Sequence, residues 1–204
     1  SVQKLLAYYI NTYNAYTVDL ILRNYPTNSI QDINGAFTNA FIPIDGSMLS
    51  LGSLENGVLR KMNEPRIHFA INCASYSCPK LLDEAYTAGK INEQLDLVTN
   101  EFINSDKNEI SENAPKLSKI FSFYTKDFEP NLAEYINKYS DTKINPNAEI
   151  TFKEYNWDLN EQLAPYFKII ASPLGNKWVF LSFKKLSRYT FRKFGICLVL
   201  LFQR

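Results

Sequence analysis

The amino-terminal segment Val2–Leu22 constrains the fold most strongly, because it is apolar at almost every position of a helical repeat. Its large apolar side chains are Leu5, Leu6, Tyr9, Ile10, Tyr13, Val18, Ile21 and Leu22. A helix that is apolar over so much of its circumference is expected to be buried on more than one side. Pro26 ends the segment, since the residue before a proline is disfavoured in helical geometry. The pattern therefore predicts a long first helix that is covered on several sides.

A β-hairpin is predicted next, over residues 41–49, with its turn at Asp45-Gly46, a pair that reaches positive φ at low cost. Ser50 is then well placed to cap a short helix that carries Glu55 beside its apolar side. Polar and apolar residues alternate from Arg66 to Cys73, which predicts a half-buried strand that leads into a loop.

Three further helices and a second strand follow. Thr87 is a suitable N-cap for a helix with Ile91, Leu95, Val98 and Phe102 at helical spacing. Residues 117–128 and 131–139 show the same periodicity, and residues 149–155 alternate like a strand. This order is not the regular βαβ alternation of a doubly wound sheet. We therefore expect an α+β fold, a single mainly helical domain with a small sheet over residues 1–165.

Composition narrows the class of protein. The 204 residues are 46% hydrophobic, which is enough for one domain with a real core. The formal net charge is +1, so bulk electrostatics give no reason to expect a nucleic-acid partner. The sequence begins at Ser1 rather than at a methionine, and we expect a domain whose amino-terminal leader was removed or not included.

The carboxy-terminal residues 166–204 differ from the rest. From Lys177 to Arg204 there are seven basic residues, interleaved with aromatics, and no acidic residue. The apolar run Gly195–Phe202 is far shorter than the roughly 20 residues that span a bilayer, so surface contact is the one membrane role that we consider. We predict that this basic and apolar tail is an appendage and not part of the core.

The residues with chemical potential gather in Glu64–Pro79. This segment holds the only histidine, His68, and two of the three cysteines, Cys73 and Cys78. On the predicted strand, Arg66, His68 and Asn72 share one face. We expect that face to line a pocket that Glu55 also reaches, with Asn11 or Asn14 of the first helix supplying hydrogen bonds.

One hypothesis is a thiol-dependent hydrolase or acyltransferase in which a cysteine is the nucleophile, His68 the base and Glu55 the group that orients the base. An extended strand separates His68 from Cys73 by about 16 Å and places them on opposite faces. Cys78, beyond the loop, is therefore a comparable nucleophile, and strict alternation would bury Cys73 as an inert hydrophobe.

The alternative is a non-catalytic ligand-binding or protein-interaction module whose polar pocket takes a small molecule or a peptide. In that case Cys73 and Cys78 are inert, or form a disulfide if their Cα atoms lie within about 7 Å, and Glu55 pairs with Arg66. A metal site built from Glu55, His68, Cys73 and Cys78 matches no standard ligand spacing, so we expect neither a metal nor a cofactor.

Four ordered motifs carry a family resemblance. Tyr9–Thr17, Leu51–Arg60, Pro65–Pro79 and Tyr155–Asn160 together resemble the domain of unknown function 547 family. The resemblance spans Val2–Asn160 and implies a bacterial or plant protein, with export to the periplasm or the cell exterior in many bacterial members. The chain departs from the family at Asn56, where the Glu-His-Gly form of the second motif has histidine. If that histidine is catalytic in the family, this chain is impaired.

Overall fold

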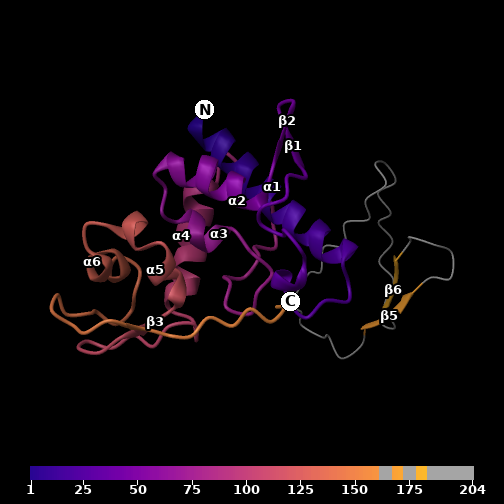
Figure 1. Ribbon diagram of the computed structural model, residues 1–204. Helices are drawn as coiled ribbons and strands as arrows, with labels where there is room; N and C mark the ends of the chain where they lie inside the picture. The colour runs from indigo at the N-terminus through magenta and orange to yellow at the C-terminus, as the bar shows by residue number, and fades with distance from the viewer. Residues whose placement is uncertain (161–166, 172–177, 183–204) are drawn as a thin grey trace. The chain divides into compact units, whose positions relative to one another are not determined.

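The computed structural model describes residues 1–160 and the two strands β5 (Phe167–Ala171) and β6 (Trp178–Ser182) (Figure 1). The chain divides into two units, Ser1–Asn160 and Glu161–Arg204. Within the second unit, β5 and β6 form an antiparallel pair, which the sequence analysis did not predict. The remainder of the predicted tail lies outside the described residues.

Helix α1 (Val2–Arg23) confirms the prediction of a long first helix. Its N-cap is Ser1, whose side chain accepts a hydrogen bond from the Lys4 amide. Ile10 and Tyr13 are almost completely buried, and the helix contacts α4 (Ile91–Ile103) as well as α2 (Leu51–Ser53) and the turns that follow α2. Its buried residues lie on one face of the helix, whereas Leu5, Tyr8 and Leu22 are exposed. The prediction that this helix is covered on several sides is therefore wrong.

The hairpin is confirmed as the antiparallel pair β1 (Ile42–Ile44) and β2 (Ser47–Leu49). Asp45 and Gly46 have φ values of 48° and 73°, as this tight turn requires. Ser50 caps α2 by accepting from the Ser53 amide.

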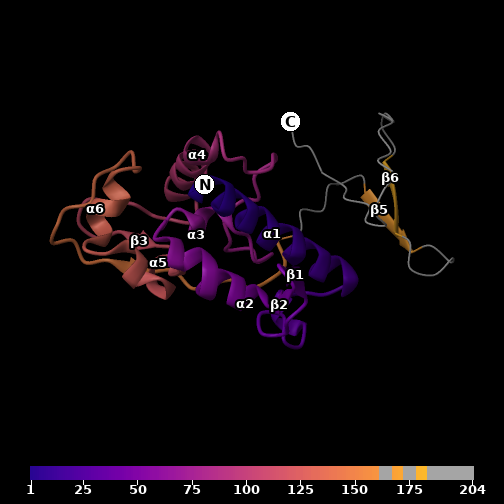
Figure 2. The same cartoon turned by 90° about the horizontal axis from the view of Figure 1, so that it is seen from above.

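The predicted short helix after the hairpin is confirmed, but its helix type changes twice along the chain. Helix α2 passes into one π turn, η2 (Leu54–Val58), and then into the 3₁₀ helix η3 (Leu59–Met62). These turns run alongside α1 in Figure 2. The π turn is the unusual part, because π turns are rare and frequently occur at functional sites.

The predicted strand from Arg66 to Cys73 is wrong. Residues Ile67–Ala70 form the short helix α3, and the chain becomes extended only at Ile71. All positions from 67 to 72 are buried, so the polar and apolar residues do not separate onto two faces and the apparent alternation misleads. Pro65, a residue favoured near helix starts, is the local signal that the alternation outweighed.

Of the remaining elements, α4 is the longest and the others are short. Helix α4 confirms its prediction, but its N-cap is Lys90 and not Thr87, whose amide donates to the Gln94 side chain instead. The other elements are η1 (Ile30–Asp32), β3 (Lys116–Leu117), α5 (Lys119–Phe123), η4 (Thr125–Phe128), α6 (Leu132–Asn137) and β4 (Thr151–Phe152). Strands β3 and β4 pair in parallel, and both views place α5, α6 and β3 together, away from the hairpin.

An aromatic cluster joins α3 to the later helices. The Phe69 ring lies 5.1 Å from the Phe102 ring and 5.7 Å from the Phe121 ring, measured between centroids, and the Phe121 and Phe128 rings are 5.1 Å apart. Helices dominate and the sheets are small, so the fold class is α+β, as predicted.

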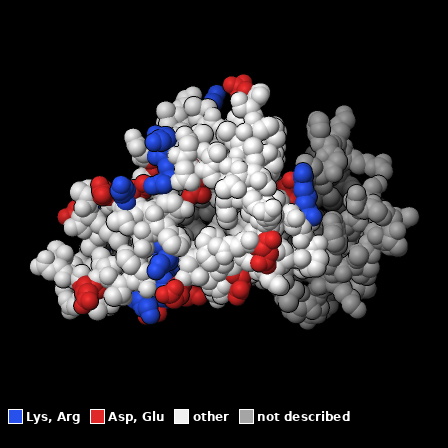
Figure 3. All heavy atoms as spheres, in the orientation of Figure 1, with Lys and Arg blue, Asp and Glu red and all other residues white. Residues whose placement is uncertain are grey.

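The surface gives no broad field of one charge on the face that Figure 3 shows. Lys and Arg are interspersed with Asp and Glu, and much uncharged surface lies between them. In the described part of the chain, no helix has both the length and the apolar character needed to cross a membrane.

Candidate functional site

The π turn directs Glu55 into the interior, where it is only 7% exposed. Its Oε2 accepts a hydrogen bond from the Tyr13 hydroxyl at 3.2 Å, and its Oε1 accepts one from the Tyr124 hydroxyl. Burial raises the pKa of Glu55, and the two tyrosine hydrogen bonds only partly oppose that shift. Neutral donors therefore hold a carboxyl group that gains a proton more readily than it does in water.

His68 is held by Asp127. Its Nε2 donates to Oδ2 of Asp127 at 2.8 Å, and its ring stacks on Tyr124 with 3.9 Å between centroids. Burial lowers the pKa of His68 to about 4, so the ring is neutral at pH 7. Because Nε2 carries the proton, Nδ1 has the lone pair. Nδ1 is buried and has no hydrogen-bond partner among the described residues.

Arg60 fixes the same aspartate from its other side. The guanidinium donates from Nε to Oδ2 at 2.6 Å and from Nη2 to Oδ1 at 2.8 Å, a bidentate geometry. Hydrogen bonding by Arg60, followed by that of His68, lowers the pKa of Asp127. Asp127 therefore stays ionised and fixes the His68 ring in one orientation.

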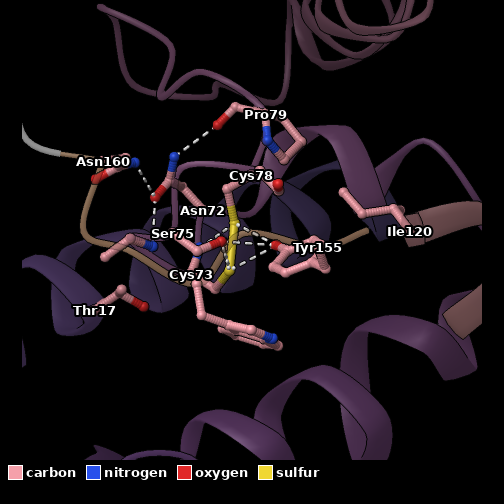
Figure 4. The surroundings of a disulfide bond; sticks show 12 residues. Thr17, Asn72, Cys73, Ser75, Cys78, Pro79, Ile120, Tyr155 and Asn160 are labelled. Carbon is pink, nitrogen blue, oxygen red and sulfur yellow. Dashed lines mark hydrogen bonds between the residues drawn. A yellow bond between two sulfur atoms is a disulfide. The ribbon is translucent and has the colours of Figure 1, made fainter. Parts of the chain in front are cut away.

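A disulfide joins Cys73 and Cys78, whose Cα atoms are 6.3 Å apart (Figure 4). The Tyr155 hydroxyl points at this bond, 3.3 Å from the Cys73 sulfur and 3.5 Å from the Cys78 sulfur. The same hydroxyl lies 2.8 Å from Oγ of Ser75. The sulfurs are thus packed against a polar group and not only against apolar side chains.

Two asparagines shape the disulfide loop. Asn72 accepts from the Ala74 amide and donates to the Pro79 carbonyl, each at 2.7 Å, so it connects both ends of the loop (Figure 4). Asn14 of α1 donates to the Ala70 carbonyl at 2.9 Å and accepts from the Asn72 amide at 2.8 Å. These bonds satisfy buried backbone groups where the short helix α3 ends.

The segment Tyr155–Asn160 covers this loop. The Tyr76 amide donates to the Asp158 carbonyl at 2.7 Å, and the Asn160 amide donates to the Ala74 carbonyl at 2.9 Å. Ser75 and Leu159 form a single antiparallel bridge. Two motifs that are far apart in the sequence therefore form one wall.

A cavity of about 230 Å³, which we call the Glu55 cavity, lies between these groups. Its polar lining comes from Tyr13, Glu55, Asn56, His68 and Tyr124, and the disulfide residues also line it. Phe37, Phe123, Tyr155 and Trp157 supply aromatic walls. A second cavity, of about 190 Å³, borders Asp19 and Arg23, which pair with each other. Only the Glu55 cavity of these two brings together ionisable groups, sulfur and aromatic rings.

The structure brings four predicted site residues together, since Glu55, His68, Cys73 and Cys78 all line the Glu55 cavity. Cys73 was expected to be buried and Cys78 to be the more accessible sulfur. The structure shows the opposite, because Cys78 is buried and Cys73 is only half-buried. The alternation that predicted a buried Cys73 does not exist once residues 67–70 are helical.

The predicted polar face of Arg66, His68 and Asn72 is wrong for the same reason. Arg66 points to α4, where it pairs with Asp96 at 2.8 Å, and it also pairs with Glu64 at 2.6 Å. The suggested pairing of Arg66 with Glu55 is therefore wrong. Asn72 and Asn14 shape the backbone beside the cavity without lining it.

Asn11 occupies a separate place on α1. Its side chain exchanges two hydrogen bonds with the backbone of Tyr86, at 2.8 and 2.9 Å. Asn11 therefore fixes the chain before α4, whereas Asn14 alone connects α1 to the disulfide loop.

Sequence reasoning missed the partners of the two central groups. Tyr13 was assigned only to the apolar helix pattern, and Tyr124 only to the periodicity of residues 117–128. Tyr155 stood in the fourth motif of the family resemblance, a signal that could have indicated it. Arg60 and Asp127 are 67 residues apart in the sequence, and no local pattern marks their contact.

Among the described residues, no group of three or more His, Cys, Asp or Glu side chains is arranged to hold a metal ion. The sulfurs of Cys73 and Cys78 are bonded to each other and do not act as thiolate ligands in this state.

Comparison with known proteins shows the family to which the chain belongs. A family model described as a protein of unknown function, DUF547, matches residues 1–103, and the chain belongs to this family. No curated protein and no solved structure matches the chain. The matched residues include Glu55, His68 and both cysteines of the disulfide, whereas Tyr124, Asp127 and Tyr155 lie beyond them.

Proposed function

We propose that the protein binds a small polar ligand in the Glu55 cavity and, in its disulfide form, does not act on that ligand chemically. The observation that supports this best is the single cavity that Glu55, His68, the disulfide and aromatic side chains line together. Concave sites with aromatic walls and a few fixed polar groups are typical of small-molecule binding.

The disulfide favours binding over thiol chemistry. A cysteine acts as a nucleophile through its thiolate, and neither Cys73 nor Cys78 has one while they are joined. Glu55 and His68, in contrast, retain capacity toward a ligand. Each carboxylate oxygen of Glu55 accepts one tyrosine hydrogen bond and has further lone pairs, and the Nδ1 atom of His68 has no protein partner among the described residues.

A thermal-shift screen of small polar compounds tests this proposal. Compounds that bind the folded protein raise its melting temperature in a concentration-dependent manner. Asn56 is an exposed residue of the cavity lining, so Asn56→Trp should fill the cavity and abolish the shifts. The matched control is Asn147→Trp at an exposed site away from the cavity, which should leave the shifts intact. Shifts that survive Asn56→Trp unchanged would contradict binding in this cavity.

A thiol-dependent hydrolase or acyltransferase is the second proposal, for the reduced protein. It is favoured because both sulfurs line the same cavity as His68. In this scheme Nδ1 of His68 takes the thiol proton, the thiolate attacks an acyl carbonyl to form a thioester, and the imidazolium returns the proton to the leaving group. Water or an acceptor alcohol or amine then releases the acyl group. Asp127, not Glu55, would orient the base, because Asp127 is bonded to its other nitrogen.

Alkylation after mild reduction tests the thiol proposal. If one cysteine is the nucleophile, iodoacetamide modifies it faster at neutral pH than it modifies a free thiol peptide, and His68→Gln slows that reaction. Cys73→Ser and Cys78→Ser identify which sulfur reacts. If both reduced thiols react slowly in the folded protein and both serine variants merely lower its melting temperature, the thiol proposal fails and the binding proposal remains.

A further inference from the structure

The charge of the Glu55 cavity restricts what it can bind. Of the described residues that line it, none is a lysine or an arginine and only Glu55 has a carboxyl group, and the His68 ring is neutral at pH 7. Arg60 lies over the ring of Tyr124, a lining residue, but its guanidinium is bonded to Asp127 and Asn56. An anionic ligand would meet no compensating positive charge in the lining, whereas a cation would be attracted to Glu55 and would favour its ionised form.

The walls of the cavity are aromatic and nearly continuous. The rings of Phe37 and Trp157 are 6.2 Å apart between centroids, those of Trp157 and Tyr155 are 4.6 Å apart, and those of Tyr155 and Phe123 are 5.4 Å apart. These four side chains come from three separate segments of the chain and all line the cavity. Aromatic faces attract cations through their quadrupole, most strongly when water is excluded.

We propose that the ligand of the Glu55 cavity is a small organic cation with an alkylammonium group, bound by the Glu55 carboxylate and the aromatic wall. This inference rests on the proposed function of the cavity as a binding site. A volume of about 230 Å³ suits a compact head group better than a drug-sized molecule.

The surroundings of Glu55 give the inference a pH signature. Tyr13 from α1 and Tyr124 after α5 donate hydrogen bonds to its carboxyl group. Arg60 from η3, Asp127 from η4 and Tyr155 from the carboxy-terminal wall also interact electrostatically with it. Burial raises the pKa of Glu55, and a bound cation favours its ionised form. Cation binding therefore releases protons in the range where Glu55 is partly protonated, and affinity increases as the pH increases through that range.

Calorimetry with choline and its carbon isostere isolates the role of charge. The isostere has the same shape, but a carbon atom replaces the quaternary nitrogen. At pH 8 we expect choline to bind about tenfold more tightly than the isostere, the size of difference that desolvated cation–π and carboxylate contacts produce. Equal affinities for the two compounds would overturn the cation proposal.

Three variants of cavity residues and one control variant distinguish the contributions of the carboxyl group, the aromatic wall and the Tyr155 hydroxyl. Glu55→Gln should weaken choline binding about tenfold and leave the isostere unchanged, whereas Glu149→Gln, at an exposed site, should alter neither. Trp157→Leu should weaken choline more than the isostere. Tyr155→Phe keeps a ring and removes the hydroxyl beside the disulfide, so it should retain choline affinity.

The outcomes distinguish this inference from the proposal on which it rests. If the isostere or another neutral compound binds as tightly as choline and Asn56→Trp blocks both, the cavity binds ligands but the cation class is wrong. If choline does not bind and the wider screen gives no shift that Asn56→Trp removes, both proposals are overturned.

Discussion

The carboxyl groups of Glu55 and Asp127 differ in their exposure to water and in the charge of the groups that donate to them. Glu55 is 7% exposed and receives hydrogen bonds from two neutral hydroxyls, whereas the Asp127 side chain is 21% exposed and receives them from a guanidinium and an imidazole. Burial raises the pKa of Glu55, and charged donors lower that of Asp127. Hydrogen-bond satisfaction alone therefore does not fix a charge, because the charge on the donors and the access of water decide it.

Asp127 and Glu55 therefore have different roles. Asp127 holds Arg60 and His68 in place and keeps its charge over the whole neutral range. Glu55 binds a proton more readily than a carboxyl group in water does, and a bound cation would favour its ionised form. The surroundings of Asp127 are thus structural support, and those of Glu55 are where we expect ligand chemistry.

Asp127→Ala should give the largest effect on stability. The substitution leaves the buried Nε2 of His68 without an acceptor and Arg60 without its bidentate partner, so we expect the free energy of unfolding to fall by about 2 to 3 kcal/mol. Urea denaturation at pH 7 measures the loss. Asp141→Ala, at an exposed position, is the control and should change stability by less than about 0.5 kcal/mol. If the two variants lower the free energy of unfolding equally, the structural role of Asp127 is contradicted.

His68, which Asp127 holds in place, should make the stability of the protein depend on pH. Burial lowers the pKa of His68 from its ordinary value of 6.5 to about 4, so the unfolded chain binds the proton more readily. The folding contribution of the neutral ring is present above pH 6.5 and is lost as the pH falls toward 4, with a slope of at most about 1.4 kcal/mol per pH unit. The melting temperatures of wild type and His68→Gln should approach each other as the pH is lowered from 7 to 4.5. A constant difference between the two melting temperatures over this range would contradict the lowered pKa.

Glu55 should act in the opposite direction with a smaller effect. A raised folded pKa means that the folded protein binds the proton more readily, so its contribution is complete below pH 4.5 and is lost as the pH rises through the folded pKa. Glu55→Gln keeps an acceptor and a donor for the tyrosines but cannot ionise. We expect this variant to be as stable as wild type or up to about 1 kcal/mol more stable at pH 8, and a loss of more than that would show that the ionised form is needed for folding.

Asn56→His should have the smallest effect on stability and a clear effect on binding. The position is exposed and contacts Arg60, so at pH 8 the neutral imidazole should change stability by less than about 0.5 kcal/mol. At pH 5 the ring is charged, and we expect choline affinity to fall further than in wild type. Asn147→His is the control for a new histidine elsewhere, and the same loss there would exclude a cavity effect.

Local signals predicted the elements that depend on neighbouring residues. The Asp45-Gly46 turn, the Ser50 cap and the helical conformation of α1 are each decided within a few residues, and the structure confirms all three. How much of α1 is buried depends on distant segments, and the prediction of burial on several sides is wrong. Helix α3 was missed because every residue from 67 to 72 is buried, which removes the two-faced pattern on which the strand prediction depended.

The sequence indicated Glu55, His68 and the two cysteines as site residues but not the side chains that bond to Glu55 and His68. These pairs meet over long separations: Glu55 and Tyr124 are 69 residues apart, and His68 and Asp127 are 59 apart. Composition and periodicity give no information on such pairs. The spacing of Cys73 and Cys78 permitted a disulfide but did not decide it, because the decision depends on a Cα separation that only the folded loop has.

The wall formed by Tyr155–Asn160 has a consequence for the order of folding. Tyr155 meets Ser75 across 80 residues of chain, and closing so long a loop has an entropic cost that only its final contacts offset. Helix α1 and the hairpin depend on local contacts and can form early. Assembly of the cavity is then a late step, and a nascent chain that has not yet reached residue 160 contains the matched family segment without a closed binding site.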